Sequence, residues 1–139
     1  MPFVKLLTAD NRVGVRDVGG SRPSENTQEA LDMIRQLDGR AYTQVVLEGD
    51  GKALLIGGGN DGRYNVVLAV NIDEAFYNLL NPAACADTEL ANTELKVVTG
   101  GQAGLFPTRQ CVDLETTLKA AAVFFDTGKM AQDLVWERQ

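Results

Sequence analysis

The chain has 139 residues, 45% of them hydrophobic, which suits one globular domain with its own core over residues 1–139. Its 19 acidic and 13 basic side chains give a formal net charge of −6, and the basic residues are scattered, which argues against nucleic acid as a partner. No apolar stretch is long enough to span a bilayer, no basic amphipathic segment suits a membrane surface, and the first residues do not resemble a secretion signal, so we expect a cytoplasmic protein.

The chain is expected to begin with a strand, which a long loop joins to the first helix. Residues 17–26, DVGGSRPSEN, are rich in Gly, Ser and Pro and predict that loop. The helix is predicted over about 27–37, with Asn26 as its N-cap and Glu29 in the reciprocal capping position. Gly39 follows as a stop signal. The residues at helical spacing that would face a core are Ala30, Leu31, Ile34 and Leu37.

Three sequential antiparallel strands are predicted next, because short β-branched or aliphatic clusters are separated by tight turns. Asp50-Gly51 and Asp61-Gly62 form these separations, and Asp-Gly is favoured in hairpin turns whose two central residues have positive φ. The predicted strands cover about 43–48, 52–57 and 63–70.

The glycine run from Gly57 to Gly62 has the G-x-G-x-x-G spacing of a dinucleotide-binding loop. Such a loop needs a following helix, because the helix N-terminus holds the pyrophosphate. Here the segment RYNVVLAV alternates like a strand, and no Lys-Ser or Lys-Thr follows the glycines as in a P-loop. We therefore interpret the run as a wide turn or a bulge.

The pattern after residue 70 is less regular. Residues 72–81 fit either a short helix capped by Asp73 or a further strand, and the strand is favoured. Residues 93–98, TELKVV, predict a strand. Residues 100–110, GGQAGLFPTRQ, are interpreted as a loop, because Pro107 argues against a central strand there.

The last forty residues predict a helix and a short terminal strand. Asp113 is a strong N-cap, Gly128 ends the helix, and the segment DLVWE returns as a strand. The apolar face of this helix consists of Leu114, Leu118, Ala121, Ala122 and Phe125. The elements together predict an α+β fold, a mostly antiparallel sheet built from hairpins with two main helices packed on it, and largely buried Trp136 and Phe125.

Residues with catalytic chemistry are sparse. The absence of His excludes Ser-His-Asp and Cys-His catalysis and removes the commonest transition-metal ligand. Cys85 and Cys111 are too few for a zinc site and are expected to be reduced thiols, one or both buried. The paired carboxylates, such as Asp73-Glu74, show no spacing that converges in a cleft or matches a calcium loop. We therefore predict no catalytic residue, no cofactor and no metal site.

The C-terminal segment CVDLETTLKAAAVFFDTGKMAQDLVWERQ resembles the end of the first-numbered immunity-protein family of bacterial polymorphic toxin systems. Members close with an Ala-rich helix ending in Phe, then Gly, then a short strand with Trp and a nearby acidic residue. The order of elements over residues 27–100 agrees more loosely. The matching residues here are Ala120, Ala121, Ala122, Phe124, Phe125, Gly128, Trp136 and Glu137.

The resemblance implies a non-enzymatic cytoplasmic inhibitor that binds a cognate toxin domain, a nucleic-acid deaminase or nuclease, and occludes its active site. An acidic inhibitor suits a toxin that binds a polyanion. Because turns place side chains in solvent, the expected contacts come from hairpin tips. They are Asp50, Asp61, Arg63, Asp73 and Glu74. Two alternatives remain open: a small-molecule-binding or enzymatic α+β domain with a cleft on the open sheet face, and a structural subunit of a homo-oligomer.

Overall fold

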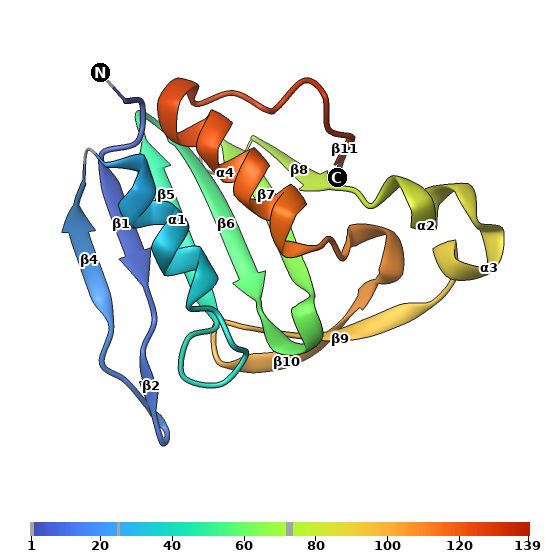
Figure 1. Ribbon diagram of the computed structural model, residues 1–139, viewed down its shortest axis with the longest axis horizontal. Helices are drawn as coiled ribbons and strands as arrows, with labels where there is room; N and C mark the ends of the chain where they lie inside the picture. Colours follow the sequence, from blue (N-terminus) through green and yellow to red (C-terminus); the bar gives the residue numbers. More distant parts are fainter. Residues whose placement is uncertain (1, 25, 72–73) are drawn as a thin grey trace.

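The computed structural model describes residues 2–24, 26–71 and 74–139, and the chain adopts an α+β fold (Figure 1). Seven strands form one antiparallel sheet in the order β11-β8-β7-β6-β5-β1-β4. These strands are β1 (Leu6–Ala9), β4 (Gly20–Pro23), β5 (Gln44–Gly49), β6 (Lys52–Gly58), β7 (Tyr64–Val70), β8 (Ala75–Leu79) and β11 (Trp136–Arg138).

Helices α1 (Thr27–Arg35) and α4 (Leu114–Thr127) contact each other and cover one face of the sheet (Figure 1). Two short ribbons accompany the sheet: β2 (Arg12–Val13) pairs with β3 (Arg16–Asp17), and β9 (Glu94–Thr99) pairs with β10 (Gln102–Pro107). The remaining elements are the short helices α2 (Pro82–Ala86) and α3 (Thr88–Ala91) and the single 3-10 turns η1 (Asn60–Gly62) and η2 (Thr108–Gln110). The predicted fold class is confirmed.

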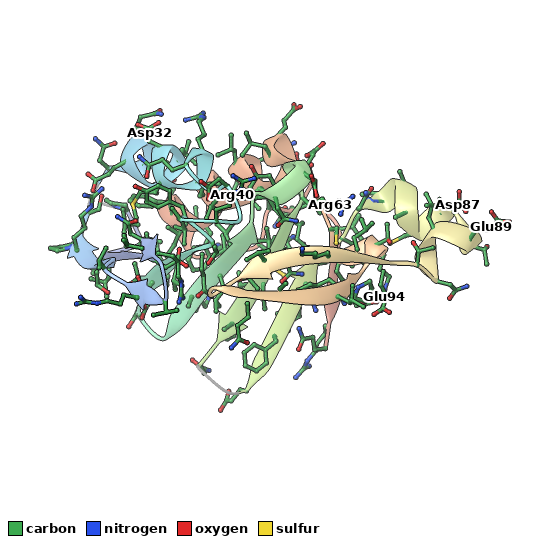
Figure 2. All side chains as sticks on the ribbon, turned by 90° about the horizontal axis from the view of Figure 1, so that it is seen from below. Asp32, Arg40, Arg63, Asp87, Glu89 and Glu94 are labelled. Carbon is green, nitrogen blue, oxygen red and sulfur yellow. The ribbon has the colours of Figure 1, made fainter. Side chains whose placement is uncertain are left out.

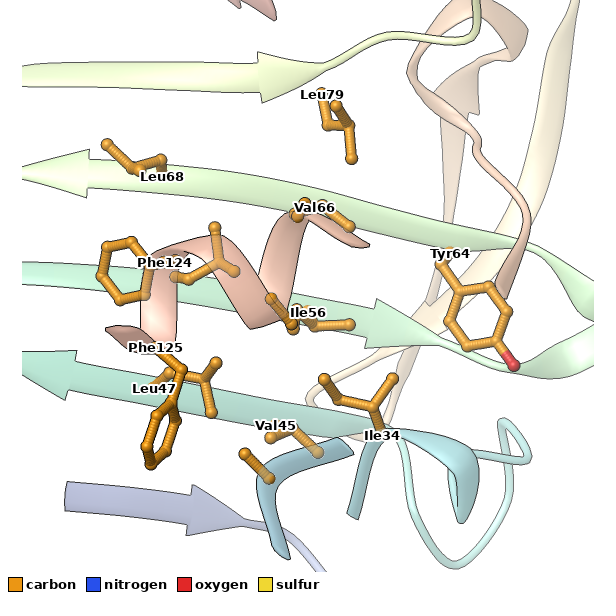
Figure 3. Packing of buried hydrophobic residues seen from close by; sticks show 14 of the residues in the cluster. Ile34, Val45, Leu47, Ile56, Tyr64, Val66, Leu68, Leu79, Phe124 and Phe125 are labelled. Carbon is orange, nitrogen blue, oxygen red and sulfur yellow. The ribbon is translucent and has the colours of Figure 1, made fainter. Parts of the chain in front are cut away.

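The core lies between the helices and the sheet. Side chains alternate between the two faces of each strand, and those on the helix-facing side belong to the core. Every second residue of β5, β6 and β7 points to the helices and is buried, whereas the residues between them point to the other face. The side chains of Phe124 and Phe125 on α4 and Ile34 on α1 fill the space above these strands (Figure 3). Each fully buried aliphatic or aromatic side chain contributes about 1.5–3 kcal/mol by leaving water.

The helix ends follow the predicted capping chemistry with two exceptions. One is the end of α1, where Gln36 in right-handed helical conformation is the C-cap instead of Gly39, and the other is at its start. Asn26 Oδ1 accepts a hydrogen bond from the Gln28 N–H at 2.9 Å, and Gly128, at φ 71°, ends α4. The Asn26 N–H, however, donates to Ser24 Oγ at 3.2 Å, while the Glu29 carboxylate pairs with Arg22 at 2.8 Å. Ser24 therefore accepts the hydrogen bond from the N-cap N–H that the sequence analysis predicts for Glu29.

Two segments interpreted as loops contain strands. Residues 17–26 include β4, which pairs with β1 at the sheet edge, and residues 100–110 include β10, which pairs with β9. Both strands are edge strands, whose partners are decided by tertiary contacts rather than by their own hydrophobic pattern. The strand alternative for residues 72–81 is confirmed by β8, although residues 72 and 73 lie outside the described part of the chain.

Candidate partner-binding surface

The predicted contact residues fall into two groups at opposite ends of the sheet. Asp50 occupies the tip between β5 and β6, and Glu74 lies in the connection between β7 and β8. These two tips are adjacent, because Asn71 donates from its N–H to the Gly51 carbonyl at 2.8 Å and from Nδ2 to Glu74 Oε2 at 3.1 Å. Asp73, which belongs to the same connection, lies outside the described residues.

Asp61 and Arg63 lie at the other end, in the connection between β6 and β7. Their side chains approach at 3.9 Å, and the Asp61 side chain is 73% exposed, so this ion pair stabilises the fold little. Strand β6 separates the two groups and has seven residues, which corresponds to about 20 Å. The four of these residues that the structure describes therefore do not form one compact cluster.

The glycine run is explained by close approaches of backbone. A Cβ at Gly57 would overlap the Thr99 side chain of β9, and a Cβ at Gly59, which has φ 97°, would overlap the Leu37 carbonyl. The glycines are followed by the single turn η1 and then by β7, so the helix that a dinucleotide site requires is replaced by a strand. The predicted turn is confirmed.

Asn60, the residue after these glycines, holds β9 against the main sheet. Its Nδ2 donates to the Lys96 carbonyl at 3.0 Å, and its Oδ1 accepts from the Val98 N–H at 3.0 Å. The side-chain amide thus supplies one donor and one acceptor to the edge of β9, as a neighbouring strand would.

The turn between β9 and β10 is tied to the body by a buried polar network. The Gly101 N–H donates to the hydroxyl of Thr43 at 2.9 Å, and that hydroxyl donates to the Asp10 carboxylate. Arg12 Nε also contacts Asp10, at 2.9 Å. One end of the β9–β10 ribbon is consequently fixed, while its other end leads to α2 and α3 at the periphery of the molecule (Figure 1).

This peripheral end carries acidic and apolar side chains that the sequence analysis did not select. Asp87 and Glu89 lie at the α2–α3 end, and Glu94 lies at the start of β9 (Figure 2). Leu90 and Leu105 are 44% and 67% exposed. The turn signal Gly100-Gly101 between two short apolar runs was available to predict this hairpin, but Pro107 directed the interpretation towards a loop.

The helix-free face of the sheet carries apolar residues where a solvated sheet face is usually polar. Val46, Leu55 and Val67, which are cross-strand neighbours on β5, β6 and β7, are half-buried. A cavity of about 300 Å³ lies at the margin of this face beside the β5–β6 tip, lined by residues that include Lys5, Glu48 and Asp50. This is the low end of the range for small-molecule pockets.

The described residues contain no group of three His, Cys, Asp or Glu side chains placed to hold a metal ion. Cys85 is exposed, Cys111 is buried, and both are free thiols. Burial raises the pKa of Cys111 above its usual value, although the nearby Arg63 guanidinium opposes this, so the thiol form is favoured. None of the helices in the described ranges is both long and apolar enough to cross a membrane.

The residues that carry the C-terminal resemblance have packing roles. Phe124, Phe125, Ala120 and Ala121 are buried in the core, and Trp136 is half-buried and donates from Nε1 to the Ala131 carbonyl at 3.2 Å. A comparison with curated proteins gave no match. The family model described as "Immunity protein Imm1" matches residues 21–138, from β4 to the end of β11. The chain therefore belongs to the immunity protein family Imm1.

Proposed function

We propose that this chain acts in the cytoplasm as a single domain that binds a cognate toxin, a nucleic-acid deaminase or nuclease, and occludes its active site. The observation that carries the proposal is the family match over residues 21–138. Strand β1, which precedes the match, pairs with both β4 and β5, so it belongs to the same sheet as the matched strands. The net charge of −6 suits a partner whose own active site attracts a polyanion.

Inhibition by occlusion requires affinity rather than catalysis. Because a small free fraction of an intracellular toxin is harmful, we expect a nanomolar or tighter dissociation constant, corresponding to about −12 kcal/mol. Electrostatic steering predicts that the association rate falls as salt is raised, while the dissociation rate changes little. Both rates are measurable by surface plasmon resonance with an inactivated toxin domain.

The direct test is coexpression with the toxin domain encoded by the neighbouring gene, followed by measurement of cell survival and of complex formation. Survival with a stable complex supports occlusion. Survival without a stable complex would favour the alternative of an enzymatic or small-molecule-binding domain, for which the cavity beside Asp50 is the specific structural observation. Absence of both survival and binding would contradict the immunity role for this toxin.

Charge reversal separates the two groups of candidate contacts. Asp50→Lys and Glu74→Lys alter one end of the sheet, whereas Asp61→Lys alters the other. Asp32→Lys is a matched control, because Asp32 is an exposed carboxylate on α1 and belongs to neither group of candidate contacts. A contact residue should slow association more than this control does. Equal effects of all four variants would show that only net charge matters.

A further inference from the structure

The outer edge of β10 has the properties of a site for strand addition. Asn60 binds the Val98 N–H and the Lys96 carbonyl, so these groups point away from β10. In an antiparallel pair, the residues opposite them also direct their backbone groups outwards. Val98 is opposite Ala103 and Lys96 is opposite Leu105. The N–H and C=O groups of Ala103 and Leu105 therefore form an open edge, and no hydrogen bond joins them to the rest of the described chain.

The side chains along this edge are unusually exposed for their type. Leu105 is 67% exposed, and Ala103 beside it is also exposed. The opposite face of the ribbon is covered, since Val97 is fully buried and Thr99 packs against Gly57. The ribbon is thus attached to the rest of the fold through β9, and β10 lies on its free side. Figure 2 shows the two strands side by side across the end of the sheet.

The charge near this edge defines the partner. The ribbon and the two short helices before it, residues 82–107, contain three carboxylates and one lysine, Lys96, which is exposed and lies opposite Leu105. The carboxylate nearest to the edge is that of Glu94, opposite Pro107. Glu89 and Glu94 are exposed and have no cationic group within 4 Å in the described part of the chain. The nearby cations Arg63 and Arg109 have carboxylate partners in Asp61 and Glu137. An extended segment rich in Lys or Arg complements this surface.

We propose that an extended, basic segment of the toxin adds to the open edge of β10 as a third strand. Backbone hydrogen bonds to Ala103 and Leu105 would supply affinity, the Leu105 side chain would be covered, and Glu94 would select a basic side chain at the Pro107 end of the edge. This inference rests on the proposed function and assigns the interface to the end of the sheet that holds Asp61. Pro107, which has no N–H, ends the open edge of β10 after a short stretch. A short edge reduces unspecific pairing with strands of other proteins.

The test uses Leu105→Pro, which removes an outward N–H and leaves the ladder between β9 and β10 intact. Leu105→Ala is the matched control, because it shortens the side chain and keeps the N–H. With an inactivated toxin domain from the neighbouring gene, we expect Leu105→Pro to weaken binding at least tenfold more than Leu105→Ala does. Binding that is equal for the two variants would overturn the strand-addition proposal, while wild-type binding and neutralisation would leave the immunity role in place.

Hydrogen exchange provides a readout that does not depend on the variant folding. In the free protein the amides of Ala103 and Leu105 should exchange fast and that of Val97 slowly, because only Val97 faces the ladder. In the saturated complex the first two should slow at least tenfold. Unchanged exchange at both would contradict the proposal. A dimer of the free chain that Leu105→Pro converts to a monomer, with toxin binding unaltered, would assign the edge to a second copy and also overturn it.

Discussion

Asp10 and Thr43 form a buried pair that joins the first strand region to the start of β5. The Thr43 N–H donates to Asp10 Oδ1 at 2.7 Å, and the Thr43 hydroxyl donates to Oδ2 of the same carboxylate. Thr43 is fully buried, and its hydroxyl also accepts the Gly101 N–H. One hydroxyl therefore donates to a buried carboxylate and accepts from the β9–β10 turn, and it connects the core to the β9–β10 ribbon.

Thr43→Val is expected to lower the free energy of unfolding by about 2–3 kcal/mol, because it leaves the Asp10 carboxylate short of a donor and the Gly101 N–H without an acceptor. Thr43→Ser keeps the hydroxyl and should cost less. Denaturant unfolding measures both, and exchange of the Gly101 amide should accelerate in the Val variant alone. Equal stability of the Val and Ser variants would show that the hydroxyl is dispensable.

Gly57→Ala should destabilise the chain by about 1–3 kcal/mol, since the added methyl overlaps Thr99 and overpacking costs this much. Removing the obstructing side chain should partly relieve the strain, so Gly57→Ala combined with Thr99→Gly is expected to be less destabilised than the sum of the single variants. A thermodynamic cycle from four unfolding curves measures this coupling. Strict additivity would mean that the two residues do not press against each other.

The glycine run should bind no nucleotide, because Gly57 and Gly59 face Thr99 and Leu37 and the Asn60 amide is occupied by β9. Calorimetry with NAD, ATP and GTP is expected to give heats of dilution only. A micromolar interaction that Gly59→Val abolishes would refute this.

Asp113 should give α4 an acid-sensitive contribution to stability. Hydrogen bonds from the Thr116 hydroxyl and N–H lower the pKa of the Asp113 carboxyl below its ordinary value, so the contribution is present above about pH 4 and disappears as the pH falls through the lowered pKa. Asp113→Ala should cost about 1 kcal/mol at neutral pH, and less in acid. Asp113→Asn keeps a hydrogen-bond acceptor but has no charge. In the same pH series of unfolding measurements, it therefore distinguishes the contribution of the charge from that of the hydrogen bond.

Phe124→Ala should cost about 3–5 kcal/mol, because the ring is fully buried and its removal leaves a cavity. Trp136→Ala should cost less, about 2 kcal/mol, since the indole is only half-buried and retains solvent contact. The expectation of a buried Phe125 is confirmed, and Trp136 packs against the core as a partly buried residue. Equal losses in chemical denaturation would show that Trp136 is as essential to the core as Phe124.

The sequence predicted the parts of the fold that local chemistry determines. Asp50-Gly51 and Asp61-Gly62 have the positive φ that their turn chemistry demands, and Asp113 and Gly128 cap α4 as expected. Strand β10 was missed because its pairing depends on β9 and on the tethering of Gly101 to Thr43. These contacts join residues far apart in the chain and leave no periodic signal in the segment itself.

The candidate surface was less predictable than the fold. Turn chemistry identified Asp50 and Asp61 as accessible, but it could not show that they lie at opposite ends of β6. Asn60 binds one edge of β9 and leaves β10, with the exposed Leu105, on the other. Residue spacing does not predict that a side-chain amide will bind a strand in this way. The contacts Asp50, Asp61, Arg63, Asp73 and Glu74 remain predictions.

The position of α4 after most strands of the sheet affects the order of events during synthesis. Six strands of the sheet precede α4, and their helix-facing residues, such as Leu47, Leu54 and Val66, stay uncovered until Phe124 and Phe125 have emerged from the ribosome. A nascent chain thus exposes an apolar sheet face that favours aggregation until α4 has been synthesised. We expect the sheet to acquire its stable packing only after α4 has emerged, so the strands made first wait uncovered for residues 114–127.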